Sequence, residues 1–449
     1  MRVIIIGCTY AGMTAAAQIL RSHPETEVTI YDRNAVVPSL SYDINDYADQ
    51  NATRPELRAE LSPQQLTVLG ADVKMGYLLM SINPAQKTVR VMGMLDDQTT
   101  EEHYDKLIIA TDATVDKPAI EGIDSMNVAL FKDELDAKVA IISAAIDRRI
   151  CVVGNSPLAL ALVDAYRQKE KEVTLITNGQ PVLHGEFADE YSQRATKLLT
   201  DANVKVVTDQ HVTKLADTGL GVSVNTNGGS YDADKVVMAA KAKPDTDIYK
   251  GELDLNDEGA IVTDKFMQTS AADVYAIGGS TDIHYNPTNS NIYDPQASEV
   301  VRQAIIAADN VMGKQIADSG TQLSVGVNLC GTTMASVGLT LERAQQAGIP
   351  ANSVMIEDNY RPEFMPTTAP VLMTLVWNQE TREIIGAQMM SKHDISESLS
   401  LISLCMQNKN TIDFLGMYDT MFQPNFDRAF NYVNLLGQAA MGKAEADSE

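Results

Sequence analysis

The sequence predicts an α/β protein that contains two strand–helix–strand units and ends in an α+β domain. Residues 2–7 read RVIIIG, an apolar strand that ends in glycine, and an amphipathic helix of about Ala11 to Ser22 follows. Residues 149–154 read RICVVG and start the same pattern again. From about residue 320 the pattern changes to alternating strands followed by helical stretches. Because 449 residues exceed what one core normally holds, each pattern indicates a separate folding unit.

The second strand of each unit completes the repeat. In the first unit this strand is Val28 to Tyr31 and ends at Asp32, and in the second it is Val173 to Ile176 and ends at Thr177. Each unit spans about 30 residues, which is the size of one dinucleotide-binding half of a Rossmann-like fold. Two such units predict either two nucleotide ligands or a duplicated fold that has lost one of them.

The remaining segments are assigned from alternation alone. We expect antiparallel strands between the units, at Val73–Tyr77, Lys87–Met92 and Leu107–Ala110, and alternating strands again at 203–225 and 235–239. In the C-terminal domain we expect an open-faced sheet and two helices, at Val371–Trp377, Ile384–Met390, 394–408 and 428–441.

The charge balance and the cysteines exclude several classes of protein. The chain has 35 basic and 60 acidic residues and a net charge of −25, which disfavours binding to nucleic acid or to an anionic membrane. No apolar run approaches the roughly 20 residues that span a bilayer. The four cysteines form no CxxC pair and the six histidines show no ligand spacing, so no metal site is expected. Sparse cysteines favour a cytoplasmic location.

The first glycine loop is Gly7-Cys8-Thr9-Tyr10-Ala11-Gly12. The first glycine permits the tight turn after the strand, and Gly12 lets the helix pack closely on the strand. Asp32 is the acid expected to hydrogen-bond a ribose. The loop therefore indicates a dinucleotide site, with a simple tight turn as the alternative.

Five longer segments carry a family resemblance: VIIIGCTYAG, YDKLIIAT, DVYAIGGSTDIHYNP, EDNYRPEFMPTT and FQPNFDRAFNYVNLL. Together they resemble the pyridine nucleotide–disulfide oxidoreductase superfamily, in its NADH oxidase, NADH peroxidase and CoA-disulfide reductase branch, and most closely the NADH oxidases of lactic acid bacteria. The resemblance implies an FAD domain of residues 1–114 and 243–320, an inserted NAD(P) domain of residues 115–242, and a domain of residues 321–449 through which homodimers form. It also implies hydride transfer from NADH to FAD, and then to a cysteine that cycles between thiolate and sulfenate, or to oxygen.

The resemblance also implies which residues hold the cofactors. For FAD they are Gly7, Thr9, Gly12, Asp32, Ala110, Thr111, Gly278, Gly279 and Ser298, and for NADH the first glycine of the second loop, Gly154. Two redox positions depart from the family pattern. Tyr42 stands in place of the redox cysteine, and a phenol cannot form a sulfenate. Tyr10 stands in place of a histidine, and with a pKa near 10 a tyrosine cannot shuttle protons at neutral pH.

Other departures fall at the expected FAD cavity. Asp112 replaces a glycine and is expected to crowd the cofactor, while Gly279 replaces the aspartate that bonds the ribityl chain. Lys241 replaces a glycine at the crossover between the domains. Glu299 lies at the start of a helix that would point at the flavin, where its charge would oppose a reduced, anionic flavin.

The second glycine loop departs further. Ser156 replaces a glycine, Pro157 removes a backbone N–H, and Ala159 replaces the third glycine. Ala161 replaces a glutamate near the nicotinamide, and Thr177 replaces the ribose-binding acid. These changes indicate a fold kept for packing, in which NADH binding is doubtful and FAD binding is possible but weakened.

Three hypotheses follow. The first is a degenerate NADH oxidase-like protein with little or no turnover. The second is an active flavoenzyme that reduces oxygen directly, without a redox cysteine. The third is a pocket that has been adapted to another nucleotide. The colour of the purified protein, and its response to NADH, would discriminate between the first two.

Overall fold

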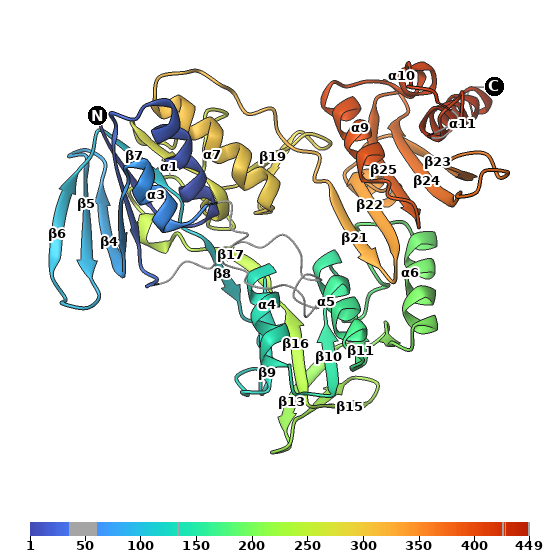
Figure 1. The fold of residues 1–449 in the computed structure, drawn as a ribbon, viewed down its shortest axis with the longest axis horizontal. Coiled ribbons are helices and arrows are strands. Elements are labelled where there is room, and N and C mark those ends of the chain that lie inside the picture. Colours follow the sequence, from blue (N-terminus) through green and yellow to red (C-terminus); the bar gives the residue numbers. More distant parts are fainter. Residues whose placement is uncertain (36–60, 133, 424–425, 427, 448–449) are drawn as a thin grey trace. The chain divides into compact units, whose positions relative to one another are not determined.

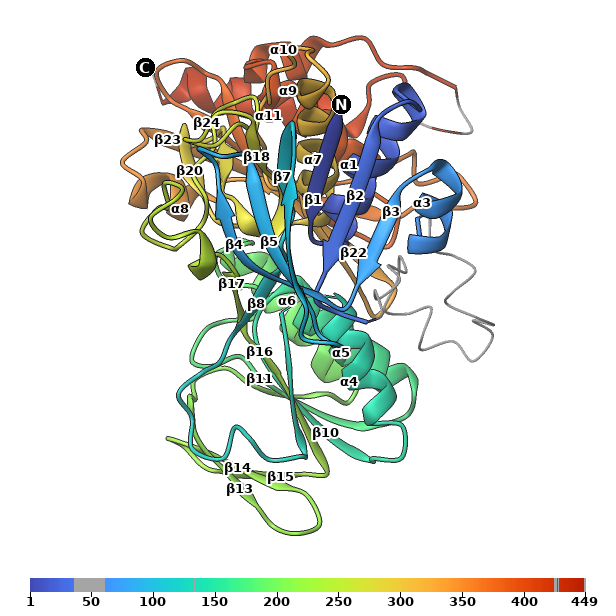
Figure 2. The same cartoon turned by 90° about the vertical axis from the view of Figure 1, so that its left-hand side faces the viewer.

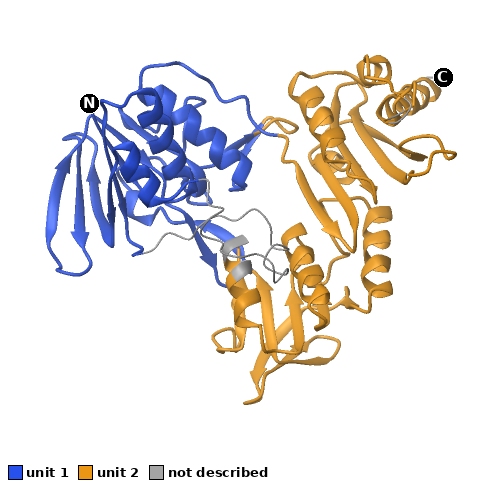
Figure 3. Cartoon of the chain, viewed as in Figure 1, with its two compact units in different colours: residues 1–117, 240–284, 290–321 blue, residues 118–239, 285–289, 322–449 orange. Residues whose placement is uncertain are grey.

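The computed structural model describes residues 1–35, 61–132, 134–423, 426 and 428–447 (Figure 1). The chain divides into two compact units, coloured blue and orange in Figure 3. Unit 1 comprises Met1–Lys117, Ala240–His284 and Ser290–Thr321, and unit 2 comprises Pro118–Ala239, Tyr285–Asn289 and Gln322–Glu449.

Unit 1 is built on a five-stranded sheet in which every described pair is parallel. In sheet order its strands are β18 (Val274–Ala276), β7 (Lys106–Ile109), β1 (Arg2–Ile6), β2 (Glu27–Asp32) and β3 (Asp72–Met75) (Figure 2). The expectation of antiparallel strands at Val73–Tyr77 and Leu107–Ala110 was therefore wrong. A continuous apolar run such as that of β7 is typical of a parallel strand buried on both faces, and alternation alone does not identify its partner.

Two layers cover this sheet. Val3 and Ile5 face a core shared with α1 (Tyr10–Ser22), α3 (Pro63–Leu69) and α7 (Ala297–Val311). Ile4 and Ile6 face the opposite core, which an antiparallel sheet covers. The strands of that sheet are β4 (Tyr77–Asn83), β5 (Thr88–Gly93) and β6 (Thr99–His103). Because successive side chains point to opposite faces, one strand contributes to both cores.

Short elements complete unit 1 and link it to the rest of the chain. The antiparallel strands β8 (Ala113–Asp116) and β17 (Lys241–Pro244) pair where the chain leaves unit 1 and where it returns. The other short elements are η2 (Asp247–Tyr249), η3 (Gly278–Ser280), β19 (Ile283–Tyr285) and β20 (Ser290–Ile292).

The first part of unit 2 repeats the plan of unit 1. Its parallel sheet has the order β12 (Lys205–Val207), β11 (Glu172–Ile176), β10 (Arg149–Val153), β16 (Lys235–Ala239) and β9 (Val128–Phe131). Its helices are α4 (Glu134–Ser143), α5 (Pro157–Gln168) and α6 (Asp189–Asp201). An antiparallel sheet of β13 (Val212–Asp217), β14 (Val222–Thr226) and β15 (Ser230–Ala233) packs against it. Strands form within the expected segments 203–225 and 235–239, where β12 and β16 pair in parallel and β13 and β14 pair antiparallel.

The C-terminal part of unit 2 is an antiparallel sheet with helices. The sheet order is β21 (Val325–Leu329), β22 (Thr332–Gly338), β25 (Ile384–Ser391), β24 (Pro370–Asn378) and β23 (Ala351–Asn359). The helices are α8 (Leu341–Gln346), α9 (Ser396–Gln407), α10 (Ile412–Met417) and α11 (Tyr432–Ala446). Together with the two parallel sheets, this confirms the predicted α/β class with an α+β C-terminal domain.

The prediction of an open-faced C-terminal sheet was wrong, because β24 and β25 are buried along almost their whole length. One face packs on α9, α10 and α11. On the other face the Tyr191 hydroxyl of α6 lies 3.0 Å from Thr374 Oγ1 and donates to the Gln388 carbonyl oxygen at 2.8 Å. Arg194, on the same helix, pairs with Glu357 of β23 at 2.7 Å. Sequence patterning missed this contact because the helix lies about 180 residues from the strands it covers.

Two absences hold for the described residues. No helix there is long and apolar enough to cross a membrane. The same residues contain no group of three or more histidine, cysteine, aspartate or glutamate side chains that could hold a metal ion.

Candidate functional site

The candidate site in unit 1 lies at the carboxyl edge of its parallel sheet. From β1 the chain passes to β2 on one side, and β7 joins β1 on the other side. Ligands of open α/β sheets bind at such a reversal of strand order, outside the carboxyl ends of the strands. Asp32 ends β2, Gly7 and Ala110 directly follow β1 and β7, and Gly278 lies two residues beyond β18.

Close packing explains the glycines of this edge. Gly7 has φ +108°, and a Cβ there would lie 2.2 Å from the Ala110 carbonyl oxygen. A Cβ on Gly12 would lie 1.9 Å from the Gly7 carbonyl oxygen. At Gly278, where φ is +70°, a Cβ would lie 2.9 Å from the Ala11 Cβ. The first helix thus touches the ends of the strands without intervening side chains.

Thr9 connects the glycine loop to its neighbours. Its Oγ1 accepts the Gly12 N–H at 3.3 Å, which caps α1, and donates to the Ala110 carbonyl oxygen at 2.9 Å. The first three helical N–H groups belong to Tyr10, Ala11 and Gly12. Because Thr9 takes the Gly12 N–H, those of Tyr10 and Ala11 have no partner within the helix and point out of its start. Such groups, together with the helix dipole, suit a phosphate.

Asp32 fixes the glycine loop from the end of β2. One carboxylate oxygen accepts the Cys8 N–H at 2.7 Å and the other accepts the Asn34 N–H at 2.7 Å. A carboxylate has about four lone-pair positions, so it retains capacity for further hydroxyl donors. Asp32 is nevertheless almost buried, with only 7% of its surface exposed. A ribose would therefore have to approach its carboxylate along the rim of the loop.

The start of α7 corrects one expectation about charge. Ser298 is exposed, but the Glu299 carboxylate is buried, forms an ion pair with Arg302 at 2.6 Å and accepts the Thr321 hydroxyl at 2.8 Å. Burial raises the pKa of Glu299, which Arg302 partly offsets. The expected unbalanced negative charge at this helix start is therefore paired within unit 1.

The remaining predicted positions of unit 1 are spread more widely. Thr111 Oγ1 donates to the Asp245 carbonyl oxygen at 3.3 Å, and half-buried Tyr10 is the first residue of α1. Lys241 is exposed at the start of β17, opposite Asp116. Tyr42 lies outside the described residues. Sequence reasoning missed Gln303 of α7, whose side-chain oxygen accepts the Gly278 N–H at 2.8 Å, because no local signal links the two.

The second glycine loop, Gly154 to Ala159, is packed as closely as the first. A Cβ on Gly154 would lie 2.7 Å from the Ala239 Cβ. Ser156 caps α5 by accepting the Ala159 N–H at 3.2 Å, which is what Thr9 does at α1. A hydroxyl at this position is therefore compatible with a helix cap. Pro157 is the stronger departure, because only the Leu158 N–H then remains at the open end of the helix.

The end of β11 differs most from its counterpart in unit 1. Thr177 is 1% exposed, and its hydroxyl donates to the Gln180 carbonyl oxygen within the following turn. The His211 ring lies over that turn, since a Cβ on Gly179 would meet it. Asp32 and Thr177 stand at equivalent strand ends of the two repeats. Asp32 has a carboxylate there that a ligand could reach, whereas the Thr177 hydroxyl is buried in its own turn.

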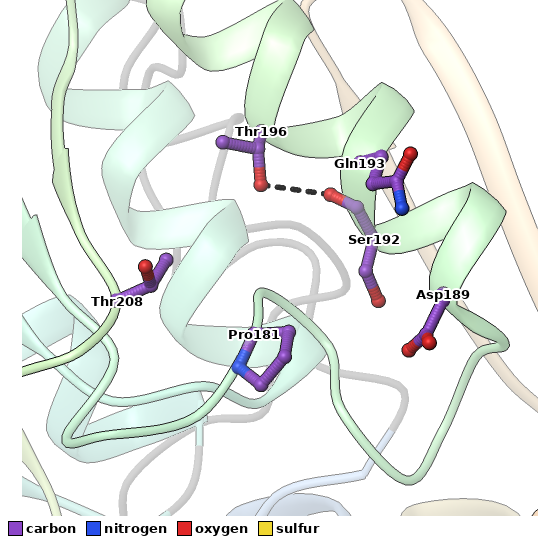
Figure 4. Close-up of a pocket in the computed structure, with 6 residues that line it drawn as sticks. All are labelled: Pro181, Asp189, Ser192, Gln193, Thr196 and Thr208. Carbon is purple, nitrogen blue, oxygen red and sulfur yellow. Dashed lines mark hydrogen bonds between the residues drawn. The ribbon is translucent and has the colours of Figure 1, made fainter.

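A cavity of about 410 Å³ lies beside this turn. Six residues of unit 2 line it: Pro181, Asp189, Ser192, Gln193, Thr196 and Thr208 (Figure 4). Four of them come from one face of α6, and none belongs to the loop from Gly154 to Ala159. The cavity therefore does not coincide with the glycine loop.

All four cysteines are described, and none has the character of a redox thiol. Burial raises the pKa of Cys8 to about 12, with a further contribution from Asp32, and it raises that of Cys151 to about 12. The pKa of half-buried Cys330 rises to about 11 through burial and the nearby Asp164, and that of Cys405 rises through burial. A thiolate is the reactive form, so the raised pKa values disfavour a redox role for these four thiols at neutral pH.

We expect iodoacetamide at pH 7.5 to alkylate the native protein roughly 100-fold more slowly than free cysteine, because each pKa unit lowers the thiolate fraction tenfold. Mass spectrometry would follow the modification, with the urea-unfolded protein as the control in which all four thiols react. One equivalent of rapid alkylation on the native chain would contradict this assignment.

The two repeats, each a glycine loop between a parallel strand and a helix, define a two-dinucleotide oxidoreductase scaffold. The family model described as pyridine nucleotide-disulphide oxidoreductase matches residues 1–309, and the model for its dimerisation domain matches residues 324–433. The chain belongs to this family.

Several of its relatives are NADH oxidases. The chain is 38% identical to the NADH oxidase of Enterococcus faecalis, over 98% of this chain and 99% of that protein. It is 30% identical to the NADH oxidase of Streptococcus pyogenes, with the same coverage. Among solved structures, the water-forming NADH oxidase of Lactobacillus brevis bound to NADH superposes with a TM-score of 0.95 and 40% identity, covering all of both chains. By ancestry the protein is an NADH oxidase-like flavin oxidoreductase, and the predicted resemblance is confirmed.

Proposed function

We propose that the protein is an NADH oxidase-like flavoprotein that keeps an FAD site in unit 1 and lacks cysteine–sulfenate chemistry, with little or no NADH turnover. The observation that carries this proposal is the contrast between Asp32 and Thr177. The first repeat presents a carboxylate at the end of its second strand, while the second repeat presents a buried hydroxyl that is used within its own turn.

The residues of unit 1 fit FAD. The open N–H groups of Tyr10 and Ala11 suit its pyrophosphate, and the remaining lone pairs of Asp32 suit its adenosine ribose. Around them we assign the rest of the predicted set: Gly7, Thr9, Gly12, Ala110, Thr111, Gly278, Gly279 and Ser298. When bound, FAD would supply the capacity to accept a hydride and pass electrons on.

The side chains at the family's two redox positions, Tyr42 and Tyr10, would not take part in electron or proton transfer. Tyr42 offers no thiol, and the four cysteines of the chain are held protonated. Tyr10 offers a phenol in place of an imidazole. The chain therefore contains no described side chain suited to carry electrons from a flavin to a disulfide or a peroxide.

The alternative function is direct oxygen reduction by an NADH-reduced flavin. The likeness to an NADH oxidase solved with NADH favours it, since the second loop keeps Gly154 and a helix cap at Ser156. This activity needs no redox cysteine. It does need NADH to bind where Pro157 and Thr177 have removed groups that would hold it.

Spectroscopy separates the two functions. The protein is purified, incubated with FAD and desalted, and its absorbance is recorded before and after NADH is added without oxygen. An oxidised-flavin spectrum that NADH does not bleach supports the proposal. Rapid bleaching overturns the loss of turnover and supports direct oxygen reduction, whereas a protein that stays colourless overturns the FAD site itself.

We also propose that the chain forms a homodimer through its C-terminal domain, residues 321–449. The matched dimerisation domain supports this. So do six large apolar side chains that are at least half exposed: Leu404, Phe414, Met417, Met421, Phe422 and Phe426. Exposed apolar groups concentrated in one short segment are typical of an interface.

Sedimentation at micromolar concentration is expected to give twice the chain mass of 48.8 kDa. Replacing Met417 and Met421 by aspartate should shift the protein to monomers, because two charges would have to be buried. The same replacement at exposed Leu95 of unit 1 is the control. A wild-type monomer would contradict this part of the proposal.

A further inference from the structure

One cavity of the second repeat lies apart from the place where its dinucleotide would bind. A ligand of this repeat is expected at the reversal of strand order, where β10 lies between β11 and β16. The cavity of about 410 Å³ beside the turn after β11 instead includes Thr208, which directly follows the edge strand β12. Because the sheet order is β12, β11, β10, the end of β11 lies between this cavity and the glycine loop that follows β10.

One face of α6 supplies four of the side chains that line the cavity. They are Asp189, Ser192, Gln193 and Thr196, which recur at the three- and four-residue spacing of a single helix face. Asp189 and Gln193 are exposed, whereas Ser192 is only 3% exposed. The polar groups therefore extend from the surface of α6 into its buried side.

The Ser192 hydroxyl is buried and has no hydrogen-bond partner within the described part of the chain. The bond drawn in Figure 4 joins the Thr196 hydroxyl to the Ser192 carbonyl oxygen, at 2.8 Å, and leaves the Ser192 side chain unused. That side chain points toward the space bordered by Pro181 and Asp189 (Figure 4). Buried hydroxyls are almost always hydrogen-bonded, so a group that occupies this space has a ready partner in Ser192.

The charge of the lining indicates which ligand can bind. Of the six described residues that line the cavity, Asp189 alone is charged. An anionic ligand would approach this carboxylate without a cationic side chain of the lining to balance it. A primary ammonium ion is strongly hydrated, and the buried part of the cavity offers it a neutral hydroxyl in place of a second carboxylate. Neither kind of ion is therefore well matched to the cavity.

A neutral polyol matches the lining better. The Asp189 carboxylate can accept hydroxyl donors in charge-assisted bonds. Ser192 and Thr208 carry hydroxyls, which donate and accept, and the Gln193 amide does both as well. The Pro181 ring gives the C–H groups of a sugar an apolar surface beside these polar groups. The volume of about 410 Å³ lies within the range of about 300–1,000 Å³ that is usual for small-molecule sites.

We propose that this cavity is a separate small-molecule site, which binds a neutral cyclic polyol of monosaccharide size. Asp189 and Gln193 bind its hydroxyls at the surface, and one hydroxyl of the ligand provides the missing partner of Ser192. The site shares no lining residue with the glycine loop from Gly154 to Ala159. A sugar can therefore bind here whether or not the protein holds FAD or NADH, and the inference goes beyond the proposed oxidoreductase function.

Saturation-transfer NMR on the full chain tests the site, with D-glucose, D-ribose and myo-inositol as the probes. We expect at least one of them to bind with a Kd of about 1–10 mM, the range of a small ligand held by a few hydrogen bonds. Asp189→Asn should weaken this binding about tenfold, because charge-assisted bonds become neutral ones. Asp201→Asn, at the exposed last residue of the same helix, is the matched control and should bind as the wild type does.

Ser192→Ala separates a binding role from a structural one. It should weaken binding about 3- to 10-fold, because the ligand loses one hydrogen bond. The thermal midpoint of the ligand-free protein should stay the same or rise, because removing an unpaired buried hydroxyl costs the protein no hydrogen bond. A lower midpoint together with unchanged binding would show a structural role and overturn the inference.

A wild type that binds none of the three probes overturns the inference, and so does an Asp189→Asn protein that binds as tightly as Asp201→Asn. Two competitors test the class of ligand and the place of the site. Displacement of the sugar by 1,4-diaminobutane would assign the cavity to amines, and displacement by NADH would make it part of the dinucleotide site. Either result overturns the proposal, whereas sugar binding that persists beside NADH and depends on Asp189 supports it.

Discussion

Gly12→Ala is expected to destabilise unit 1 by more than about 4 kcal/mol, although alanine is the better helix former by about 1 kcal/mol. The reason is the 1.9 Å separation between the added Cβ and the Gly7 carbonyl oxygen. That oxygen belongs to backbone that the sheet holds in place, so the helix must move away from the strand. Steric overlap therefore outweighs the gain in helix propensity.

Circular dichroism and differential scanning calorimetry would measure this loss as a lower midpoint temperature for the unfolding of unit 1. FAD uptake should disappear with it, since the open end of α1 moves too. The matched control is Gly442→Ala in α11, where an added Cβ meets nothing within 4 Å. That variant should gain up to about 1 kcal/mol from helix propensity. Equal effects of the two substitutions would contradict the packing argument.

Tyr191→Ala is expected to destabilise unit 2 by about 3–5 kcal/mol, the usual cost of removing a fully buried aromatic ring. Tyr191 is completely buried between α6 and the C-terminal sheet. Tyr191→Phe should cost about 1–3 kcal/mol, because the Gln388 carbonyl oxygen and the Thr374 hydroxyl lose a partner.

Chemical denaturation followed by the fluorescence of Trp377, the only tryptophan, reports directly on this sheet. Gln193→Ala, at an exposed position of the same helix, is the control and should change stability by less than about 0.5 kcal/mol. A Tyr191→Ala protein as stable as this control would mean that the contact between α6 and the sheet contributes little.

Much of the fold could be predicted because its strongest constraints are local. The strands at Val28–Tyr31 and Val173–Ile176 and the glycines at Gly7 and Gly154 were recognised, since a buried strand and a turn that excludes a Cβ are encoded by neighbouring residues. The direction of β3 and β7 was not recognised. Strand pairing joins residues far apart in the chain, and no local pattern distinguishes a parallel neighbour from an antiparallel one.

The candidate site shows the same limit. Sequence reasoning found Asp112, Gly279 and Glu299 but interpreted each one alone. The structure places Asp112 against Gly279, and it pairs Glu299 with Arg302 and Thr321. A substitution can be judged only with the atoms that it meets. Position along the chain shows which residue has changed, but spatial contacts show whether another residue compensates for it.

The contact of α6 with the C-terminal sheet has a consequence for how this protein can change over generations. Without residues 118–239, Thr374 and Gln388 would lose the helix that covers them, and the face of the sheet opposite α9, α10 and α11 would meet water. Deleting that segment would therefore destabilise the C-terminal domain, whatever the segment binds. Selection for a stable C-terminal domain can therefore retain the segment even if its nucleotide site is lost, since the hydrogen bonds of the Thr177 hydroxyl stay with Gln180, Val207 and Thr208.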